Sequence, residues 1–156
     1  MNIRKAQDGD FDKIMELLFD IAALHGRGRP DIFAAAEGSK YTKEQLAEIA
    51  ADPNRPIFVA VDGGGTVAGY AFCMAKTYSN PVMVGHKAFY IDDFCVDETR
   101  RGQHIGTELF EYIKNYAKEN GFYNIELNVW EFNSAAVRFY EKCGMKTQRR
   151  NMEFIL

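Results

Sequence analysis

The spacing of apolar residues divides the chain into segments with a helical period and segments with a strand period. Residues 2–6 are expected to form an edge strand, and Asp8 is expected to cap a helix that runs to about His25. Four apolar residues at three- and four-residue spacing mark the core face of this helix: Phe11, Ile14, Leu18 and Ile21. The pattern then breaks at residues 25–33, where two glycines and a proline predict a polar loop.

A short second helix is predicted next, because Thr42 and Gln45 have the spacing of a capping box and Asp52-Pro53 stops the segment. From Pro56 onwards the apolar pattern favours strands. Residues 57–61 and 66–75 are expected to form a β-hairpin around the glycine run 63–65, and residues 88–96 a long strand.

The C-terminal half alternates between helices and strands. A helical stripe begins at Ile105 and ends at Gly121, a residue type favoured just after a helix C-terminus. A strand over 122–129, a helix over 133–143 and closing strand structure over 145–156 follow. The order β-α-α-β-β-β-α-β-α-β predicts a mixed α/β (α+β) fold, with a central sheet flanked by helices.

Residues 97–107, between the strand 88–96 and the next helix, are rich in arginine and glycine. Backbone N–H groups at a helix N-terminus lack intrahelical partners, and the helix dipole adds about half a positive charge at that end. Arg100 and Arg101 offer further donors to phosphate oxygens. We therefore expect this segment to bind a pyrophosphate.

Two common phosphate-binding motifs do not fit. A P-loop ends in Gly-Lys-Ser/Thr, and a dinucleotide fingerprint needs three glycines inside a βαβ unit; the chain has neither. Residues 101–106, Arg-Gly-Gln-His-Ile-Gly, do resemble motif A of the GNAT family of acetyl-CoA-dependent N-acetyltransferases, Gln/Arg-x-x-Gly-x-Gly/Ala. His104 stands where that family usually has glycine, so the turn must accommodate a side chain there.

A second stretch resembles the same family. Its signature Asn-x-x-Ala-x-x-Phe-Tyr-x-x-x-Gly-Phe is matched by residues 133–145, with Met145 in place of the last Phe. The element order is also similar to the GNAT fold from end to end. In that fold the fourth and fifth strands, here 89–96 and 122–129, splay apart. The resemblance therefore implies a single acetyl-CoA-dependent N-acetyltransferase domain over residues 1–156.

Composition supports one domain and narrows the partners. The 156 residues, 47% hydrophobic, suit one sizeable core. No apolar stretch is long enough to span a bilayer and the N-terminus lacks the apolar core of a signal peptide, so we expect a cytoplasmic protein without a membrane partner. The formal net charge of −3 argues against a nucleic-acid partner. The cysteines, Cys73, Cys95 and Cys143, and the three histidines lack metal-ligand spacing, so no metal is expected.

The resemblance implies how acetyl-CoA would be held. Its pantetheine arm would lie in the gap between the splayed strands and pair, like an added strand, with backbone groups of Phe94, Cys95 and Val96. Its diphosphate would contact the loop residues Arg101, Gly102, Gln103, His104, Ile105, Gly106 and Thr107. On the helix of the second signature, cofactor contacts are expected from Asn133, Ala136 and Tyr140. Asn133 is also a good N-cap.

Acetyl transfer to an amine needs a neutral nucleophile, a polarised thioester carbonyl and a proton for the leaving thiolate. Tyr140 occupies the position of the family's tyrosine and is expected to be the acid, since the ordinary pKa of a phenol, near 10, exceeds that of a thiol. The alternative is a core role, because Ala136, Tyr140 and Cys143 share one helix face. Carbonyl polarisation is assigned by analogy to backbone N–H groups near Val96.

Asp92 and Asp93 are the candidates for the general base. Side chains alternate along a strand, so the two carboxylates should face opposite ways unless a bulge intervenes. A carboxylate in a half-buried cleft would have a raised pKa. Asp92 is placed ahead of Asp93, because acetyltransferases that act on polyamines often carry an acidic pair here. Alternatively, one Asp pairs with a loop arginine and the other attracts substrate charge.

The sequence therefore predicts transfer of an acetyl group from acetyl-CoA to a primary amine of a small molecule or peptide, by direct attack in a ternary complex. A non-catalytic acyl-CoA-binding or regulatory domain and a nucleotide-binding module remain as alternatives. The acidic pair favours a cationic acceptor. In the family, the region that contains His25, Arg27 and Arg29 borders the acceptor cleft. The two arginines, by contrast with the acidic pair, favour an acceptor that carries a carboxylate. Dimers are common among similar proteins, so a homodimer stays open.

Overall fold

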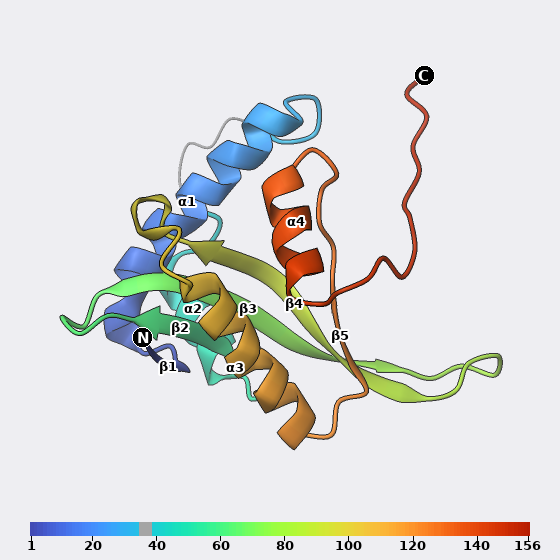
Figure 1. The fold of residues 1–156 in the computed structure, drawn as a ribbon, viewed down its shortest axis with the longest axis horizontal. Helices are drawn as coiled ribbons and strands as arrows, with labels where there is room; N and C mark the ends of the chain where they lie inside the picture. Colours follow the sequence, from blue (N-terminus) through green and yellow to red (C-terminus); the bar gives the residue numbers. More distant parts are fainter. Residues whose placement is uncertain (35–38) are drawn as a thin grey trace.

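The computed structural model describes residues 1–34 and 39–156, and its centre is a five-stranded sheet in the order β1-β2-β3-β4-β5 (Figure 1). Neighbouring strands are antiparallel except for β4 and β5, which are parallel. The strands span Asn2–Lys5 (β1), Ile57–Val61 (β2), Val67–Tyr78 (β3), His86–Val96 (β4) and Asn124–Leu127 (β5). A mixed sheet of this kind confirms the predicted fold class.

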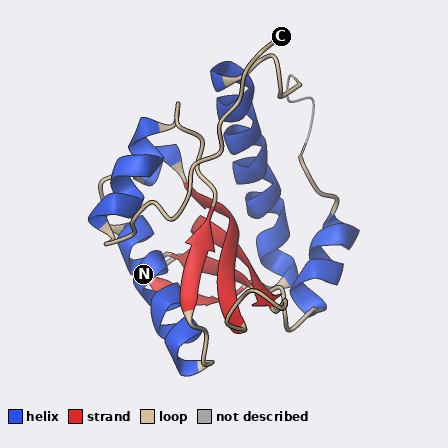
Figure 2. Cartoon of the chain, turned by 90° about the vertical axis from the view of Figure 1, so that its right-hand side faces the viewer, coloured by secondary structure: helices blue, strands red, loops and turns tan. Residues whose placement is uncertain are grey.

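Helices cover both faces of the sheet (Figure 2). They span Phe11–Gly28 (α1), Lys43–Ala51 (α2), Ile105–Glu119 (α3) and Ser134–Lys142 (α4), with short 3-10 turns at Asp8–Asp10 and Glu98–Arg100. Strand β2 shows why both faces are apolar. Ile57 and Val59 pack with the buried residues of α1 and α2, whereas Phe58 between them packs with those of α3. A strand buried on both sides must be apolar throughout, as β2 is.

Local signals in the sequence locate most elements well. Thr42 and Gln45 form the predicted capping box at the start of α2, with reciprocal hydrogen bonds of 3.2 and 2.9 Å. The glycine run joins β2 to β3 in an antiparallel hairpin, and Gly65 adopts φ +85° in its turn. Gly121 and Gly144 follow the ends of α3 and α4 with φ of +73° and +90°. These positive φ angles explain why glycine ends both helices.

The predicted end of the first helix is wrong. Helix α1 extends past His25 into the first part of the expected loop and ends at Gly28, just before Arg29-Pro30. Glycine costs about 1 kcal/mol in a helix, which is not enough to end one that is held by packing. Gly28 also has to be a glycine for steric reasons, because a Cβ at this position would lie 2.1 Å from the ring of Phe132.

The predicted closing strand is also wrong. Residues 143–156, here named the C-terminal arm, form neither helix nor strand, and the arm leaves the base of α4 and runs away from the sheet (Figure 1). Within the described part of the chain, its last backbone hydrogen bond joins the Met145 N–H to the Tyr140 carbonyl. A strand needs a neighbouring edge to bond with, and residues 146–156 make no backbone–backbone hydrogen bond with any described residue.

Candidate active site

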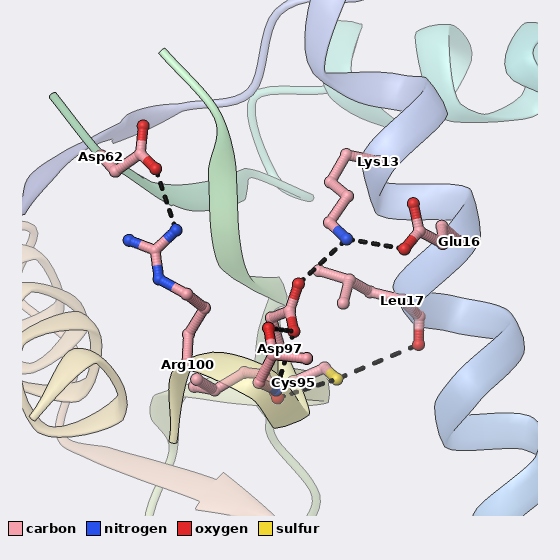
Figure 3. Close-up of polar contacts among 9 residues, drawn as sticks. Lys13, Glu16, Leu17, Asp62, Cys95, Asp97 and Arg100 are labelled. Atoms are coloured by element: carbon pink, nitrogen blue, oxygen red, sulfur yellow. Dashed lines mark hydrogen bonds and ion pairs between the residues drawn. The ribbon is translucent and has the colours of Figure 1, made fainter. Parts of the chain in front are cut away.

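Asp97 anchors the loop that follows β4. Its Oδ1 accepts hydrogen bonds from the Thr99 N–H (3.0 Å) and hydroxyl (2.7 Å), and its Oδ2 lies 2.9 Å from the Lys13 Nζ of α1 (Figure 3). These contacts, the Thr99 hydroxyl first and Lys13 second, lower the pKa of Asp97 to about 2. The ionised carboxylate therefore ties the loop to α1. In the sequence, the single indication that Asp97 anchors the loop is its position directly after the strand 88–96.

The two loop arginines have different roles, although both were expected to contact phosphate. The Arg100 guanidinium is 2.9 Å from the Asp62 carboxylate of the β2–β3 hairpin, so it braces the loop (Figure 3). Among the described residues, the Arg101 guanidinium pairs with Glu98 alone, at 3.3 Å, and both side chains are exposed. An exposed ion pair of this kind contributes little, so Arg101 can turn towards an anion.

The turn into α3 presents a row of backbone donors. In the described part of the chain, none of the N–H groups of residues 102–107 donates a hydrogen bond to a protein acceptor. They lie at the N-terminus of a 15-residue helix, where the dipole favours negative charge. The residues present therefore fit the diphosphate of acetyl-CoA.

His104 and Gly106 shape this turn in opposite ways. His104, the N-cap of α3, has φ +62°, and it is the single non-glycine residue with positive φ among those described. Holding a side chain in this left-handed conformation costs about 1–3 kcal/mol, which accounts for the glycine of motif A at this position. At Gly106 a Cβ would lie 3.3 Å from the Phe139 ring and 3.5 Å from Val96. Its hydrogen atom lets α3 pack closely against α4 and β4.

The end of β4 has an unpaired edge on the side of β5. Pairing between the two strands ends at Ile91 and Leu127, whereas β4 continues to Val96 beside β3. The Asp97 N–H donates to the Ala68 carbonyl of β3, at 2.9 Å. Because hydrogen-bonding directions alternate along a strand, the backbone groups of Phe94 and Val96 point to the open side. This geometry fits the splayed strands expected of the GNAT fold.

Cys95 lies between these two residues but faces the other way. Its thiol is buried against α1, 3.9 Å from the Leu17 carbonyl (Figure 3). Burial raises its pKa to about 12, so the thiol stays protonated. Cys95 is thus a core residue by its side chain, and its backbone groups point to β3, away from the open edge expected to hold the pantetheine arm.

A β-bulge places Asp92 and Asp93 on one side of β4. Phe72 of β3 pairs with Asp93, and the next residue, Cys73, pairs with Ile91, so Asp92 is the extra residue. Both carboxylates then approach the same amine, with the Lys40 Nζ 3.7 Å from Asp92 and 4.0 Å from Asp93. The sequence analysis expected the two carboxylates to face opposite ways unless a bulge intervened, and the structure has this bulge.

Asp93 is the more enclosed of the two carboxylates. Its side chain is 12% exposed, against 32% for Asp92, and it accepts a 3.2 Å hydrogen bond from the Tyr70 hydroxyl. Burial raises the pKa of Asp93 to about 6, although the charge of Lys40 and the hydrogen bond from Tyr70 oppose the rise. A carboxylate with such a pKa can exchange protons near neutrality.

Tyr140 projects from α4 into an aromatic cluster. Its ring centroid lies 5.2 Å from that of Phe139, 6.2 Å from Phe94 and 6.5 Å from Phe110. Burial first, and then the Asp93 carboxylate, raise its pKa well above the ordinary value, and no described residue hydrogen-bonds to its hydroxyl. The ring therefore has the packing of a core residue, while the hydroxyl stays protonated and near Asp93.

Asn133 caps α4. Its Oδ1 accepts a 3.2 Å hydrogen bond from the Ala136 N–H, which confirms the predicted N-cap. This use of the oxygen leaves the side-chain NH₂ to meet a ligand. This hydrogen bond also joins the first turn of α4, which contains Ala136, to the segment between β5 and α4.

A row of aromatic side chains, here named the aromatic wall, lies near Lys40, the amine that the acidic pair holds. His25 stacks on Phe33 at 5.1 Å, Phe33 meets Trp130 edge-on at 5.2 Å, and Trp130 stacks with Phe132 at 6.1 Å. Burial and the nearby charge of Lys40 lower the pKa of His25, so the wall is uncharged near pH 7. Sequence reasoning left Trp130 without a role and did not consider Phe33 or Phe132, because the three aromatics lie in irregular segments without a recognisable spacing.

The side chains of Arg27 and Arg29 lie in different parts of the molecule. Arg29 pairs with Asp31 at 2.7 Å and with Glu153 of the C-terminal arm, and its guanidinium lies 5.9 Å from the centre of the Trp130 ring. Arg27 lines a small hollow together with Val96 and Arg101 at the end of β4. The two residues predicted to share an acceptor loop thus border different regions: Arg27 lies near the loop of residues 97–107, and Arg29 lies near the aromatic wall.

Fold and loop together define a mixed α/β protein with a turn of free backbone amides after an open central strand. Comparison with known proteins makes this class specific. The sequence model of the acetyltransferase (GNAT) family matches residues 18–145. The chain belongs to this family, as its two signatures indicated. Across the described residues, 1–34 and 39–156, no helix is both long enough and apolar enough to cross a membrane.

Individual relatives agree. Glucosamine 6-phosphate N-acetyltransferase 1 of Dictyostelium discoideum is 31% identical over 126 residues, which cover 76% of each chain. The solved structure of a tetramutant of the BH1408 protein from Bacillus halodurans is 34% identical, covers 100% of both chains and superposes with a TM-score of 0.95. Glucosamine-6-phosphate N-acetyltransferase from Arabidopsis thaliana is 25% identical, with a TM-score of 0.72 and coverage of 99% and 97%.

Proposed function

We propose that this protein transfers an acetyl group from acetyl-CoA to a primary amine of a small molecule or peptide, by direct attack in a ternary complex. The observation that carries the proposal is the meeting of three features at the end of β4. They are the bulged acidic pair, the Tyr140 hydroxyl and the unpaired strand edge that leads to the row of free amides.

The chain supplies binding groups along one line. The N–H groups of residues 102–107 and the side chain of Arg101 would hold the diphosphate. The backbone groups of Phe94 and Val96 would pair with the pantetheine amides, as an added strand does. When bound, acetyl-CoA supplies a thioester carbonyl and a thiol leaving group. The Val96 N–H points to the open side of β4, where it would donate a hydrogen bond to this carbonyl and polarise it.

Lys40 supports an amine as the acceptor. Its Nζ lies within 4.0 Å of both carboxylates, so the acidic pair already holds one primary ammonium of the chain itself. An acceptor amine that displaces Lys40 would meet the same two carboxylates. The aromatic wall near Lys40 suits an acceptor with an apolar or ring-shaped body.

Asp93 is the better-supported general base. Its pKa of about 6 leaves it ionised at neutral pH and able to accept a proton from the bound ammonium, directly or through water. Asp92, more exposed, would hold the amine in place. Tyr140, protonated and close to Asp93, would donate a proton to the leaving sulfur, because its pKa lies above that of a thiol.

The test is turnover with a panel of amines, amino acids, aminoglycosides, amino sugars and peptides, followed as release of free CoA thiol. Tyr140→Phe should lower kcat while leaving the affinity for CoA, measured by calorimetry, within about threefold. Tyr112→Phe on α3 is the matched control and should leave both values unchanged. A protein that binds CoA but acetylates no amine would instead be a non-catalytic acyl-CoA-binding domain.

A further inference from the structure

One lysine of the chain lies at the candidate active site. The Lys40 Nζ is 3.7 Å from the Asp92 carboxylate and 4.0 Å from that of Asp93, and the Lys40 side chain is 48% exposed. Both distances are longer than an ordinary hydrogen bond of about 2.9 Å, so the amine is held near the two carboxylates without being locked to either. Among the described residues, Lys40 is the single lysine that pairs with them.

The residues after Lys40 fix its position. The Tyr41 ring stacks on Phe72 with 5.7 Å between the ring centroids, and Phe72 is the residue of β3 that pairs with Asp93. The Lys40 Nζ itself lies 5.1 Å from the centre of the Tyr41 ring, within the range of a cation–π contact. Thr42 is the N-cap of α2. These contacts join the backbone beside Lys40 to the sheet and to α2, so the fold itself brings this amine to Asp93.

Asp93 is the neighbour that Lys40 shares with Tyr140. Burial opposes the charged form of Lys40, but the negative charges around it, that of Asp93 first, outweigh burial and raise its pKa. Lys40 is therefore an ammonium until a base takes its proton. Burial and then the charge of Asp93 raise the pKa of Tyr140. An amine, a carboxylate that can take its proton and a phenol that can give one thus lie in a single site.

We propose that Lys40 is a self-acetylation site, to which the protein transfers the acetyl group of bound acetyl-CoA when no external amine takes the acceptor position. This inference rests on the proposed function. The Lys40 ammonium gives one proton to Asp93, and the Nζ lone pair forms a C–N bond to the acetyl carbonyl carbon while the C–S bond breaks. The leaving thiolate takes a proton from Tyr140, which regains one from the Nζ. The products are Nε-acetyl-lysine, free CoA and protonated Asp93.

Self-acetylation would change the site that it occurs in. Acetyl-lysine is neutral, so Asp92 and Asp93 would lose the cation that lies near them. The charge of Lys40 at present opposes the effect of burial on Asp93. Without this charge, Asp93 would bind its proton more tightly and would be a weaker acceptor of protons near pH 7.

Peptide mapping by mass spectrometry tests the modification, after incubation of the full chain with acetyl-CoA and no added amine. Lys43 is the internal control, because it lies three residues away, is 55% exposed and pairs with Asp12 instead. Lys40 should be acetylated at least about 100 times faster than Lys43, the lower end of what a general base contributes. Asp93→Asn, and separately Tyr140→Phe, should remove this excess at Lys40 and leave the rate at Lys43 unchanged.

The kinetics separate this inference from the proposed function. Transfer within one chain has a rate constant that does not depend on protein concentration; a rate constant that rises with it would show transfer between molecules and overturn the proposal. Turnover of the amine panel is measured in parallel. A protein that acetylates external amines, while Lys40 reacts no faster than Lys43, would overturn self-acetylation and leave the proposed function standing. Absence of both reactions would overturn both.

Carboxyl-carbon NMR tests the contact itself, without any turnover. Lys40→Gln carries a neutral amide, as acetyl-lysine does, so the pKa of Asp93 should rise above its value of about 6. Lys43→Gln should leave this pKa unchanged. An Asp93 pKa that Lys40→Gln does not move would show that the amine is not held at the acidic pair, and would overturn the proposal.

Discussion

Replacing Asp93 by Asn should have opposite effects on activity and on stability. The substitution keeps the size of the side chain and removes its charge. As the proposed general base, Asp93 would contribute about 100-fold to 10,000-fold to the rate, so kcat/KM should fall by that factor. In the unmodified protein, kcat/KM should rise with pH and level off above about 6, the pKa of Asp93. The variant should lose this dependence.

The stability effect follows from the same pKa. The folded protein holds Asp93 protonated up to about pH 6, whereas the unfolded chain ionises it near 3.8. Stability therefore falls as pH rises from about 4 to 6, by about 3 kcal/mol at 1.36 kcal/mol per pKa unit. Asn carries no charge and avoids this loss. At pH 7.5 the variant should melt roughly 6–12 °C higher, and at pH 3.5 the two proteins should be nearly equal.

Thermal melts at pH 3.5 and 7.5, together with steady-state rates from pH 5 to 9, measure both effects. Asp92→Asn is the matched control, because its side chain is more exposed; it should change the rate less and leave the melting temperature almost unchanged. A variant at Asp93 that keeps the pH profile, or that loses stability at pH 7.5, would refute the assignment of Asp93 as a buried base.

Three further predictions concern the loop and α1. His104→Gly should stabilise the protein by about 1 kcal/mol by relieving φ +62°, whereas His104→Ala should not; chemical denaturation separates them. Asp97→Asn should cost about 2 kcal/mol at pH 7, because the folded pKa of about 2 stabilises the protein above pH 4 and this gain vanishes as pH falls towards 2. Gly26→Ala has ordinary contacts at 3.5 Å and should gain up to about 1 kcal/mol, whereas Gly28→Ala would collide with the Phe132 ring and should lose this gain.

The sequence was sufficient for the elements whose signals are local. Helix caps, the glycine turn and the apolar periods depend on a few neighbouring residues, and they place α2, the β2–β3 hairpin and α4 almost at their observed bounds. The two family signatures likewise lie within single segments. For this reason, the sequence alone could name the loop that we expect to bind phosphate and place Tyr140 on a helix.

Features that depend on distant residues could not be predicted. The bulge at Asp92 arises from pairing with Phe72 and Cys73, and the approach of Lys40 to the acidic pair joins residues far apart in the chain. The length of α1 depends on how Gly28 packs against Phe132, far along the chain. The predicted closing strand was wrong for a related reason: a strand forms only where the chain pairs with a neighbouring edge, and residues 146–156 make no backbone–backbone hydrogen bond with any described residue.

The central claim is that the amide groups of residues 102–107 bind the diphosphate of acetyl-CoA and so direct its acetyl group to the acidic pair. A crystal structure with acetyl-CoA is the most direct test. We predict diphosphate oxygens within about 3.2 Å of several of these amide nitrogens, with the pantetheine arm along Phe94 and Val96. A diphosphate bound elsewhere, with these amides out of reach of it, would contradict the account.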